Sequence, residues 1–159
     1  MRRVNDVDLL REVIELGVES AAGEGGPFGA LVALEGGRVV GRGSNRVVSD
    51  GDPTLHAEVV AIREACRTLG THDLSGAVLY ASCEPCPMCF GAAYWARVDR
   101  IVHAASRADA AAAGFDDAAI HADVARAPHE RELATVQLLA EEGWRPFAAW
   151  EANPARTPY

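Results

Sequence analysis

The chain has 159 residues, of which 49% are hydrophobic and 24% charged, a balance typical of a globular domain with a substantial core. Acidic residues outnumber basic ones by 23 to 15, and the net charge of −8 disfavours nucleic acid as a partner, because phosphate contacts need a basic surface. The sequence shows neither a signal-peptide pattern nor an apolar run long enough to span a bilayer, so we expect a cytoplasmic protein without a membrane partner.

The N-terminal part of the sequence predicts a helix followed by a β-hairpin. Apolar residues recur at helical spacing from about Asp6 to Ala22, and Asn5 is available as the N-cap. Two short runs, Gly29 to Leu34 and Arg38 to Gly43, flank the turn Glu35-Gly36-Gly37 and predict two paired strands.

The middle of the chain alternates between helix and strand. After a polar loop, Asp52-Pro53-Thr54 indicates the start of a helix that continues to about Leu69. Its inward residues are expected to be Val59, Ile62, Cys66 and Leu69. Two apolar runs, Ala77 to Ala81 and Arg100 to Ala104, predict buried strands. Between them we expect a helix that begins near Pro85 or Cys86 and runs to about Ala96.

The last third is expected to contain short helices between Ala104 and Ala127, a fifth strand from Ala134 to Leu139 and a final helix from Pro146 to Asn153. The resulting order, α-β-β-α-β-α-β-α-β-α, predicts an α/β protein in which helices cover both faces of one sheet. We therefore expect a single three-layer α/β/α domain that spans residues 1–159.

Three residues have the chemistry and placement of zinc ligands. His56 and the pair Cys86 and Cys89 each lie at the start of a predicted helix, and cysteines three residues apart share one helical face. Tetrahedral zinc accepts imidazole and thiolate, and three protein ligands leave a fourth position for water, as in a catalytic site. Free N–H groups at a helix start also favour the thiolate form of cysteine.

Glu58 is the candidate proton shuttle. It follows His56 by two residues in the same first turn, so it can approach a water on the zinc without coordinating the ion. Two thiolates offset the charge of the ion and leave it a weaker Lewis acid. A neighbouring base must therefore help to deprotonate that water. We expect a dry pocket to raise the pKa of Glu58, as suits a group that both accepts and donates a proton.

The main competing interpretation of these residues is a structural zinc site that also uses Cys83. Such a closed Cys₃His site would exclude water from the ion and leave Glu58 without a task. The His-x-Glu and Pro-Cys-x-x-Cys pattern, however, is the signature of zinc deaminases, so we favour the open site. Cys66, in an apolar helical stretch, is expected to be a small buried hydrophobic residue.

At these motifs the sequence resembles the cytidine deaminase superfamily and, within it, the bacterial guanine deaminases. The similarity covers nearly the whole chain. Beyond the zinc motifs it rests on five segments: Gly26-Pro27-Phe28-Gly29-Ala30, Asp52-Pro53-Thr54, Tyr94-Trp95-Ala96-Arg97, Ala113-Gly114-Phe115-Asp116-Asp117 and the terminal Tyr159. The resemblance implies a cytidine-deaminase-like fold around a central mixed five-stranded sheet.

The same resemblance implies roles in a purine site. His56, Cys86 and Cys89 correspond to the ligands of Zn²⁺, and Glu58 to the proton shuttle. The residues implied to bind or act on the base are Phe28, Asn45, the backbone N–H of Ala57, Trp95, Asp117 and Tyr159. In that family Tyr159 would arrive with a C-terminal segment, about residues 144–159, swapped between the subunits of a homodimer.

Considered without the resemblance, several of these residues have a second interpretation. Phe28, Trp95 and Phe115 would fit a hydrophobic core equally well. Asn45 follows a strand and could stabilise a turn. Asp117 could cap a helix, in which case Asp116 is the competing carboxylate.

We expect hydrolysis of guanine to xanthine and ammonia, with Glu58 and Asp117 as the acid–base groups and a small purine base as the partner. Other aminated heterocycles, namely guanosine, cytosine or cytidine, a pterin or an aminotriazine, remain alternatives because one polar contact can change such a preference by orders of magnitude. Deamination of tRNA adenosine is disfavoured by the acidic balance of the chain. The remaining alternative is a structural zinc module without catalysis.

Overall fold

A computed structural model describes residues 5–159 of the chain. The residues form two compact units, one that ends at Asp117 and one that comprises Ala118–Tyr159, and each is described by itself. Among the described residues no helix combines the length and the apolar composition that crossing a membrane requires.

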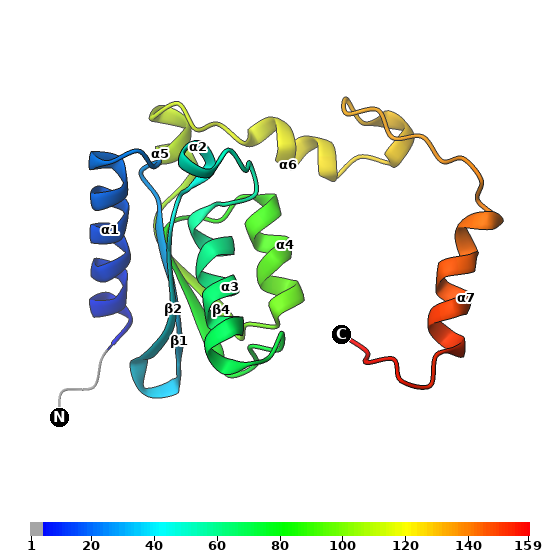
Figure 1. Cartoon of the computed structure of the whole chain (residues 1–159). Coiled ribbons are helices and arrows are strands. Elements are labelled where there is room, and N and C mark those ends of the chain that lie inside the picture. Colours follow the sequence, from blue (N-terminus) through cyan, green and yellow to red (C-terminus); the bar gives the residue numbers. More distant parts are fainter. Residues whose placement is uncertain (1–4) are drawn as a thin grey trace. The chain divides into compact units, whose positions relative to one another are not determined.

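The first unit is built on a mixed sheet with the strand order β2-β1-β3-β4 (Figure 1). The strands are β1 (Gly29–Leu34), β2 (Arg38–Ser44), β3 (Ala77–Cys83) and β4 (Arg100–Ala105). β1 runs antiparallel to both of its neighbours, whereas β3 and β4 are parallel because the helix α4 (Pro87–Ala96) connects them. The predicted mixed sheet and four of its five expected strands are confirmed.

The fifth expected strand is wrong for this chain. Residues 134–139 form no strand, and Val136, Leu138 and Leu139 are 77%, 80% and 70% exposed. An isolated strand is unstable because its backbone N–H and C=O groups need a neighbouring strand. The described residues of the second unit contain no other strand to supply one.

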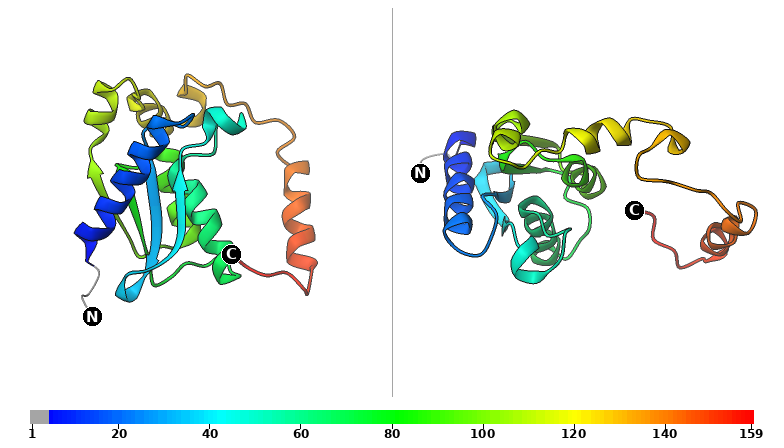
Figure 2. Two further views of the ribbon diagram at one scale, coloured as in Figure 1. Left: turned by 60° about the vertical axis from the view of Figure 1, so that its left-hand side comes forward. Right: turned by 90° about the horizontal axis from the view of Figure 1, so that it is seen from above.

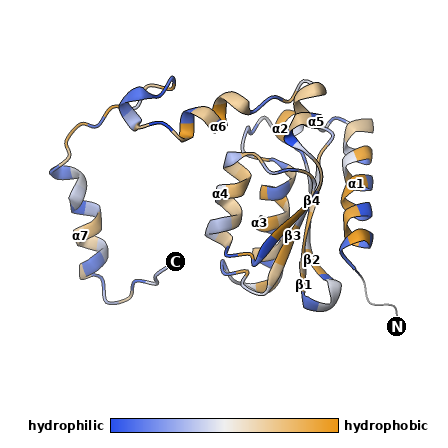
Figure 3. Ribbon diagram, turned by 180° about the vertical axis from the view of Figure 1, so that it is seen from behind, coloured by the Kyte–Doolittle hydropathy of each residue, from blue (hydrophilic) through white to orange (hydrophobic). Residues whose placement is uncertain are grey.

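Helices cover both faces of the sheet and produce the expected three layers. α1 (Asp6–Ala22) lies on one face, and α3 (Ala57–Leu69) and α4 (Pro87–Ala96) lie on the other (Figures 1 and 2). The two central strands, β1 and β3, are hydrophobic along most of their length (Figure 3). Successive side chains alternate between the faces, so Leu31 packs in the core under α1 and Val32 in the core under α3.

The helices follow the expected boundaries closely. The side chain of Asn5 accepts a hydrogen bond from the backbone N–H of Asp8 and caps α1, as predicted. The predicted short helices are α5 (Arg107–Ala112) and α6 (Ala118–Val124), and the final helix is α7 (Arg145–Ala152). One short helix, α2 (Val47–Asp50), lies in the polar loop that the sequence predicts after the hairpin.

The contact between α3 and β2 determines where the zinc motif lies. Gly41 and Gly43 share one face of β2, and a Cβ atom on Gly43 would lie 2.2 Å from the carbonyl oxygen of Ala57. The helix therefore packs with its backbone against the strand through small residues. Its buried residues are Ala57, Glu58, Ala61, Ile62 and Ala65. This corrects the expected inward set, since Val59, Cys66 and Leu69 are only partly buried.

Substituting Gly43 by Ala should destabilise the protein by about 3 kcal/mol, because the new methyl group would meet backbone atoms of α3 that cannot move independently. The melting temperature should fall by about 6–12 °C. Gly91→Ala is the matched control, since a Cβ atom there meets nothing within 4 Å and alanine favours the interior of α4. Thermal unfolding of the two variants checks this, and equal melting temperatures would contradict the close packing.

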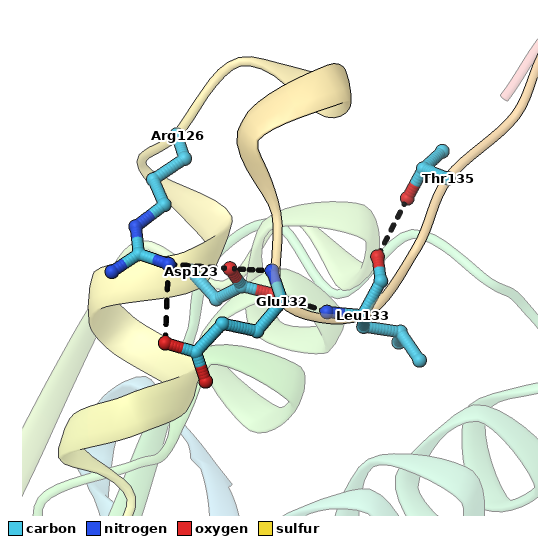
Figure 4. Close-up of polar contacts among 5 residues, drawn as sticks. All are labelled: Asp123, Arg126, Glu132, Leu133 and Thr135. Carbon is cyan, nitrogen blue, oxygen red and sulfur yellow. Dashed lines mark hydrogen bonds and ion pairs between the residues drawn. The ribbon is translucent and has the colours of Figure 1, made fainter.

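The second unit has local polar contacts but no core. The Asp123 carboxylate accepts hydrogen bonds from the backbone N–H groups of Glu132 and Leu133, at 2.8 and 3.3 Å, and Arg126 forms ion pairs with Asp123 and Glu132 (Figure 4). These contacts hold α6 to the segment that precedes residue 134. None of the residues from 118 to 159 is buried, so hydrophobic packing contributes little to the order of this unit in a single chain.

Candidate active site

The three predicted metal ligands lie together at the starts of two helices. His56 is the N-cap of α3, Cys86 is the N-cap of α4, and Cys89 lies in the first turn of α4. Their ligand atoms all lie within 4.8 Å of one another. Pro87 at the first position of α4 has a backbone angle suited to a helix start, which helps to place both cysteines. One nitrogen and two sulfurs at this separation suit a tetrahedral zinc ion.

Cys83 is not part of this group. Its Sγ atom lies 3.5 Å from the backbone oxygen of Ser106, to which it donates a hydrogen bond, and burial raises the pKa of its thiol. Among the described residues the metal-capable cluster consists of His56, Cys86 and Cys89 alone. The geometry thus supports a site with three protein ligands over the closed four-ligand alternative.

The two candidate thiolates differ in acidity. A hydrogen bond from the Cys89 thiol, together with a smaller contribution from His56, whose Nδ1 lies 3.6 Å from the Cys86 sulfur, lowers the pKa of Cys86 to about 4. The same bond to Cys86 raises the pKa of Cys89, and burial adds to the effect. Cys86 is therefore a thiolate near neutral pH even before a cation binds. Cys89 must lose its proton when a cation binds, because metal ions coordinate the thiolate form.

Glu58 is buried beside these ligands, with 7% of its surface exposed. Burial is the largest influence on its carboxyl group and raises the pKa, although hydrogen bonds from its own backbone N–H and from Cys89 offset part of the rise. The direction agrees with the prediction from the sequence. A carboxyl group with a raised pKa can both take and return a proton near neutral pH.

Asn45 directly follows β2, and its neighbour Arg46 connects this part of the chain to the residues just before α3. Its backbone N–H donates to the oxygen of Phe28, and its side-chain oxygen accepts from the N–H of Val47 at 3.3 Å. The neighbouring Arg46 donates its N–H to the oxygen of Leu55, directly before His56. The turn-stabilising interpretation of Asn45 is therefore correct for its oxygen, and among residues 5–159 no group accepts a hydrogen bond from its amide nitrogen. The orienting role of Val47 was not foreseen, because no sequence signal marks it.

Two further predicted residues lie around the same region. Ala57 is fully buried, and in the part of the chain that the structure describes its backbone N–H, at the first position of α3, has no acceptor. Phe28 is half-buried and packs edge-to-face on Phe115, with ring centroids 5.0 Å apart. The segment that ends at Asp117 thus contacts the Gly-Pro-Phe turn through an aromatic pair. Asp117 is half-buried, whereas Asp116 is exposed.

Trp95 and Tyr159 are both largely exposed in the structure. Trp95 lies near the C-terminal end of α4, nine residues beyond Cys86 and therefore about 13 Å further along the helix axis, and 71% of its surface is exposed. Tyr159 is 72% exposed and belongs to the second unit. Their roles as pocket walls stay predictions.

Comparison with known proteins places these features in context. Residues 3–105 match the family described as the cytidine and deoxycytidylate deaminase zinc-binding region. Guanine deaminase from Bacillus subtilis is 45% identical over 148 residues, which is 92% of this chain and 94% of that protein.

Two solved structures are also similar to this chain. The X-ray structure of guanine deaminase from Bacillus subtilis superposes with a TM-score of 0.94 at 43% identity and covers 98% of this chain and 99% of that one. A variant protein solved in complex with 8-azaguanine matches with a TM-score of 0.70 at 40% identity, over 72% of this chain and 66% of that one.

Proposed function

The chain belongs to the cytidine and deoxycytidylate deaminase zinc-binding family, and on that basis we propose that it is a zinc-dependent deaminase that hydrolyses guanine to xanthine and ammonia. The observation that carries this proposal is the open group of His56, Cys86 and Cys89 with the buried Glu58 beside it. The guanine substrate is supported by the 45% identity to a guanine deaminase over 92% of the chain.

His56, Cys86 and Cys89 hold the zinc ion in this proposal. The donor set of one imidazole and two thiolates fits Zn²⁺, and the lowered pKa of Cys86 favours cation binding. When bound, zinc acts as a Lewis acid that makes a water molecule nucleophilic near neutral pH. The need for reduced thiols at the site agrees with the cytoplasmic location that we propose.

Glu58 moves the protons of the reaction. It takes a proton from the attacking water as the new C–O bond forms at C2 of guanine, and it delivers that proton to the adjacent ring nitrogen. A second proton must reach the exocyclic amine so that the C–N bond breaks and ammonia leaves. Glu58 takes this second proton from the new hydroxyl group on C2, whose oxygen becomes the carbonyl oxygen of xanthine, and passes it to the amine, and Asp117 assists as a second carboxylate near the amine. Water and guanine are thus converted to xanthine and ammonia without any other reactant.

The base is held by polar contacts and an aromatic wall. The free amide nitrogen of Asn45 and the backbone N–H of Ala57 donate to acceptors on the purine, which supports recognition of a ring with several lone pairs. Phe28, fixed by Phe115, provides an apolar surface for the ring. Trp95 and Tyr159 form further walls of the pocket.

Ammonia release measured on a panel of bases and nucleosides tests the substrate. We expect guanine to be turned over at least about a hundredfold faster than guanosine, cytidine and adenine, because buried donors discriminate strongly between rings with different edges. Similar rates on several of these compounds would reject guanine as the specific substrate. Faster turnover of adenosine in a tRNA stem-loop would favour the tRNA deaminase alternative.

We further propose that the enzyme is a homodimer in which the C-terminal segment, about residues 144–159, is swapped. The support is that this segment exposes large apolar side chains in a single chain, with Trp144, Phe147 and Tyr159 at 57%, 58% and 72%. Exposed clusters of this kind mark an interface. In the swapped dimer Tyr159 closes the pocket of the partner subunit.

A complementation experiment tests the swap. One chain carries Glu58→Gln and the other lacks Tyr159, so each homodimer should have low activity. In mixed dimers the intact tail of the first chain would close the intact site of the second, and random pairing should restore about a quarter of the native activity. If mixing restores nothing although mixed dimers form, Tyr159 does not act across the interface.

A further inference from the structure

The turn that follows α1 packs directly against the side chain of Asn45. Two successive residues of this turn, Gly25 and Gly26, are glycines, and both are partly buried. A Cβ atom on Gly26 would lie 3.2 Å from both Cγ and Oδ1 of Asn45, and 3.5 Å from its Cβ. The atoms of the described chain nearest to this position therefore all belong to the side chain of Asn45.

The same turn also holds the backbone of Asn45. A Cβ atom on Gly25 would lie 2.5 Å from the carbonyl oxygen of Asn45. The backbone N–H of Asn45 donates to the oxygen of Phe28 at 3.1 Å, and the N–H of Phe28 donates to the oxygen of Gly26 at 2.8 Å. Phe28 and Asn45, the aromatic wall and the amide donor of the proposed base site, are thus joined through this turn.

Two contacts fix the orientation of the Asn45 carboxamide. The first is the hydrogen bond at 3.3 Å from the backbone N–H of Val47, which identifies the accepting atom as oxygen because an N–H group can only donate. This bond is long, so a small displacement of the carboxamide would break it. The second contact is with Gly26, where a methyl group would displace the carboxamide by a few tenths of an ångström.

We propose that Gly26 is a positioning residue for recognition of the base. Because it has no side chain, Asn45 can keep the orientation in which Val47 occupies the oxygen and the NH₂ group is left to donate to the purine. This inference rests on the proposed function, in which Asn45 binds the base. A contact made equally to the bound substrate and to the transition state changes KM and leaves kcat unchanged. Gly26 therefore acts on the affinity for the base and not on the chemistry at Glu58.

Steady-state deamination of guanine by a Gly26→Ala variant tests the proposal. We expect KM to rise about three- to tenfold, the loss that one misplaced hydrogen bond produces, while kcat changes by less than about twofold. Gly23→Ala is the matched control from the same turn, because a Cβ atom there makes only ordinary contacts, at 3.6 and 3.8 Å, with backbone oxygens of α1. The control should keep the native KM.

A double-mutant cycle with Asn45→Ala shows whether Gly26 acts through Asn45. Once the carboxamide is removed, the methyl group of Gly26→Ala has room, so it should raise KM no further and should not lower the melting temperature of the Asn45→Ala protein. If Gly26→Ala alone fails to fold, the double variant should fold again and carries the test. A further rise in KM of the same size in the Asn45→Ala background would overturn the proposal.

The NMR signal of the Asn45 side-chain amide supplies a readout that needs neither guanine nor turnover. It is the signal that the Asn45→Ala protein lacks, and Gly26→Ala should shift it whereas Gly23→Ala should not. An unshifted signal in Gly26→Ala would overturn the positioning role, and so would a shifted signal with a native KM. If the native chain does not deaminate guanine, the proposed substrate is wrong, and KM is then compared on the base that is turned over fastest.

Discussion

Replacement of Glu58 by Gln is expected to slow guanine deamination by about a thousandfold or more while the zinc stays bound. The side chain is buried beside the metal group, and its pKa is raised by that burial. Glutamine has nearly the same volume but cannot accept a proton from water or return it to the ring. The loss should therefore fall on the chemical step and leave the fold and the metal in place.

Turnover on guanine and zinc content per chain check this prediction together. Glu64→Gln is the matched control, because Glu64 lies on the same helix and glutamine can still accept the hydrogen bond from the N–H of Arg42. Full activity in the Glu58 variant would exclude the proton shuttle. Loss of zinc from that variant would instead mean that Glu58 contributes to metal binding.

Substitution of Cys89 by Ser is expected to remove most of the bound zinc and with it the activity, whereas Cys83→Ala should retain both. Cys89 is fully buried, and its sulfur lies within 4.8 Å of the ligand atoms of His56 and Cys86. A serine hydroxyl is a much poorer ligand for zinc than a thiolate. Cys83 instead donates to the oxygen of Ser106, so its removal should cost only about 1 kcal/mol of stability.

Metal analysis and thermal unfolding of the two variants distinguish these cases. The Cys89 variant should melt at a lower temperature than the native protein, because zinc binding stabilises the folded state. Adding a chelator to the native chain should have the same effect. A Cys83→Ala protein without zinc would overturn the proposed ligand set and favour the closed four-ligand site.

The elements that were predicted correctly are those with a local signal. The helical spacing of apolar residues and the cap at Asn5 located α1, and the glycine turn located the β1–β2 hairpin. The zinc motif was equally local, since His56 and Glu58 share one helical turn and Cys86 and Cys89 another. Such patterns depend only on residues a few positions apart, so they can be recognised without the fold.

The features that the sequence predicted wrongly or left open all depend on residues that are distant in the sequence. The inward face of α3 differs from the expected one because Gly41 and Gly43 bring β2 against its alanines, a contact that periodicity does not reveal. Residues 134–139 have the composition of a strand but find no neighbouring strand within the described chain. The exclusion of Cys83 depends on the position of Ser106, which lies 23 residues further along the chain.

The amino-acid sequence by itself therefore determined the order of elements, the three-layer class and the chemistry of the metal group. Spacing along one helix turn already brings ligand and proton shuttle together. Only the tertiary structure decided that His56 meets Cys86 and Cys89 and that Phe28 packs on Phe115. These features are decided by packing between separate elements, and packing depends on distances in space that no local pattern encodes.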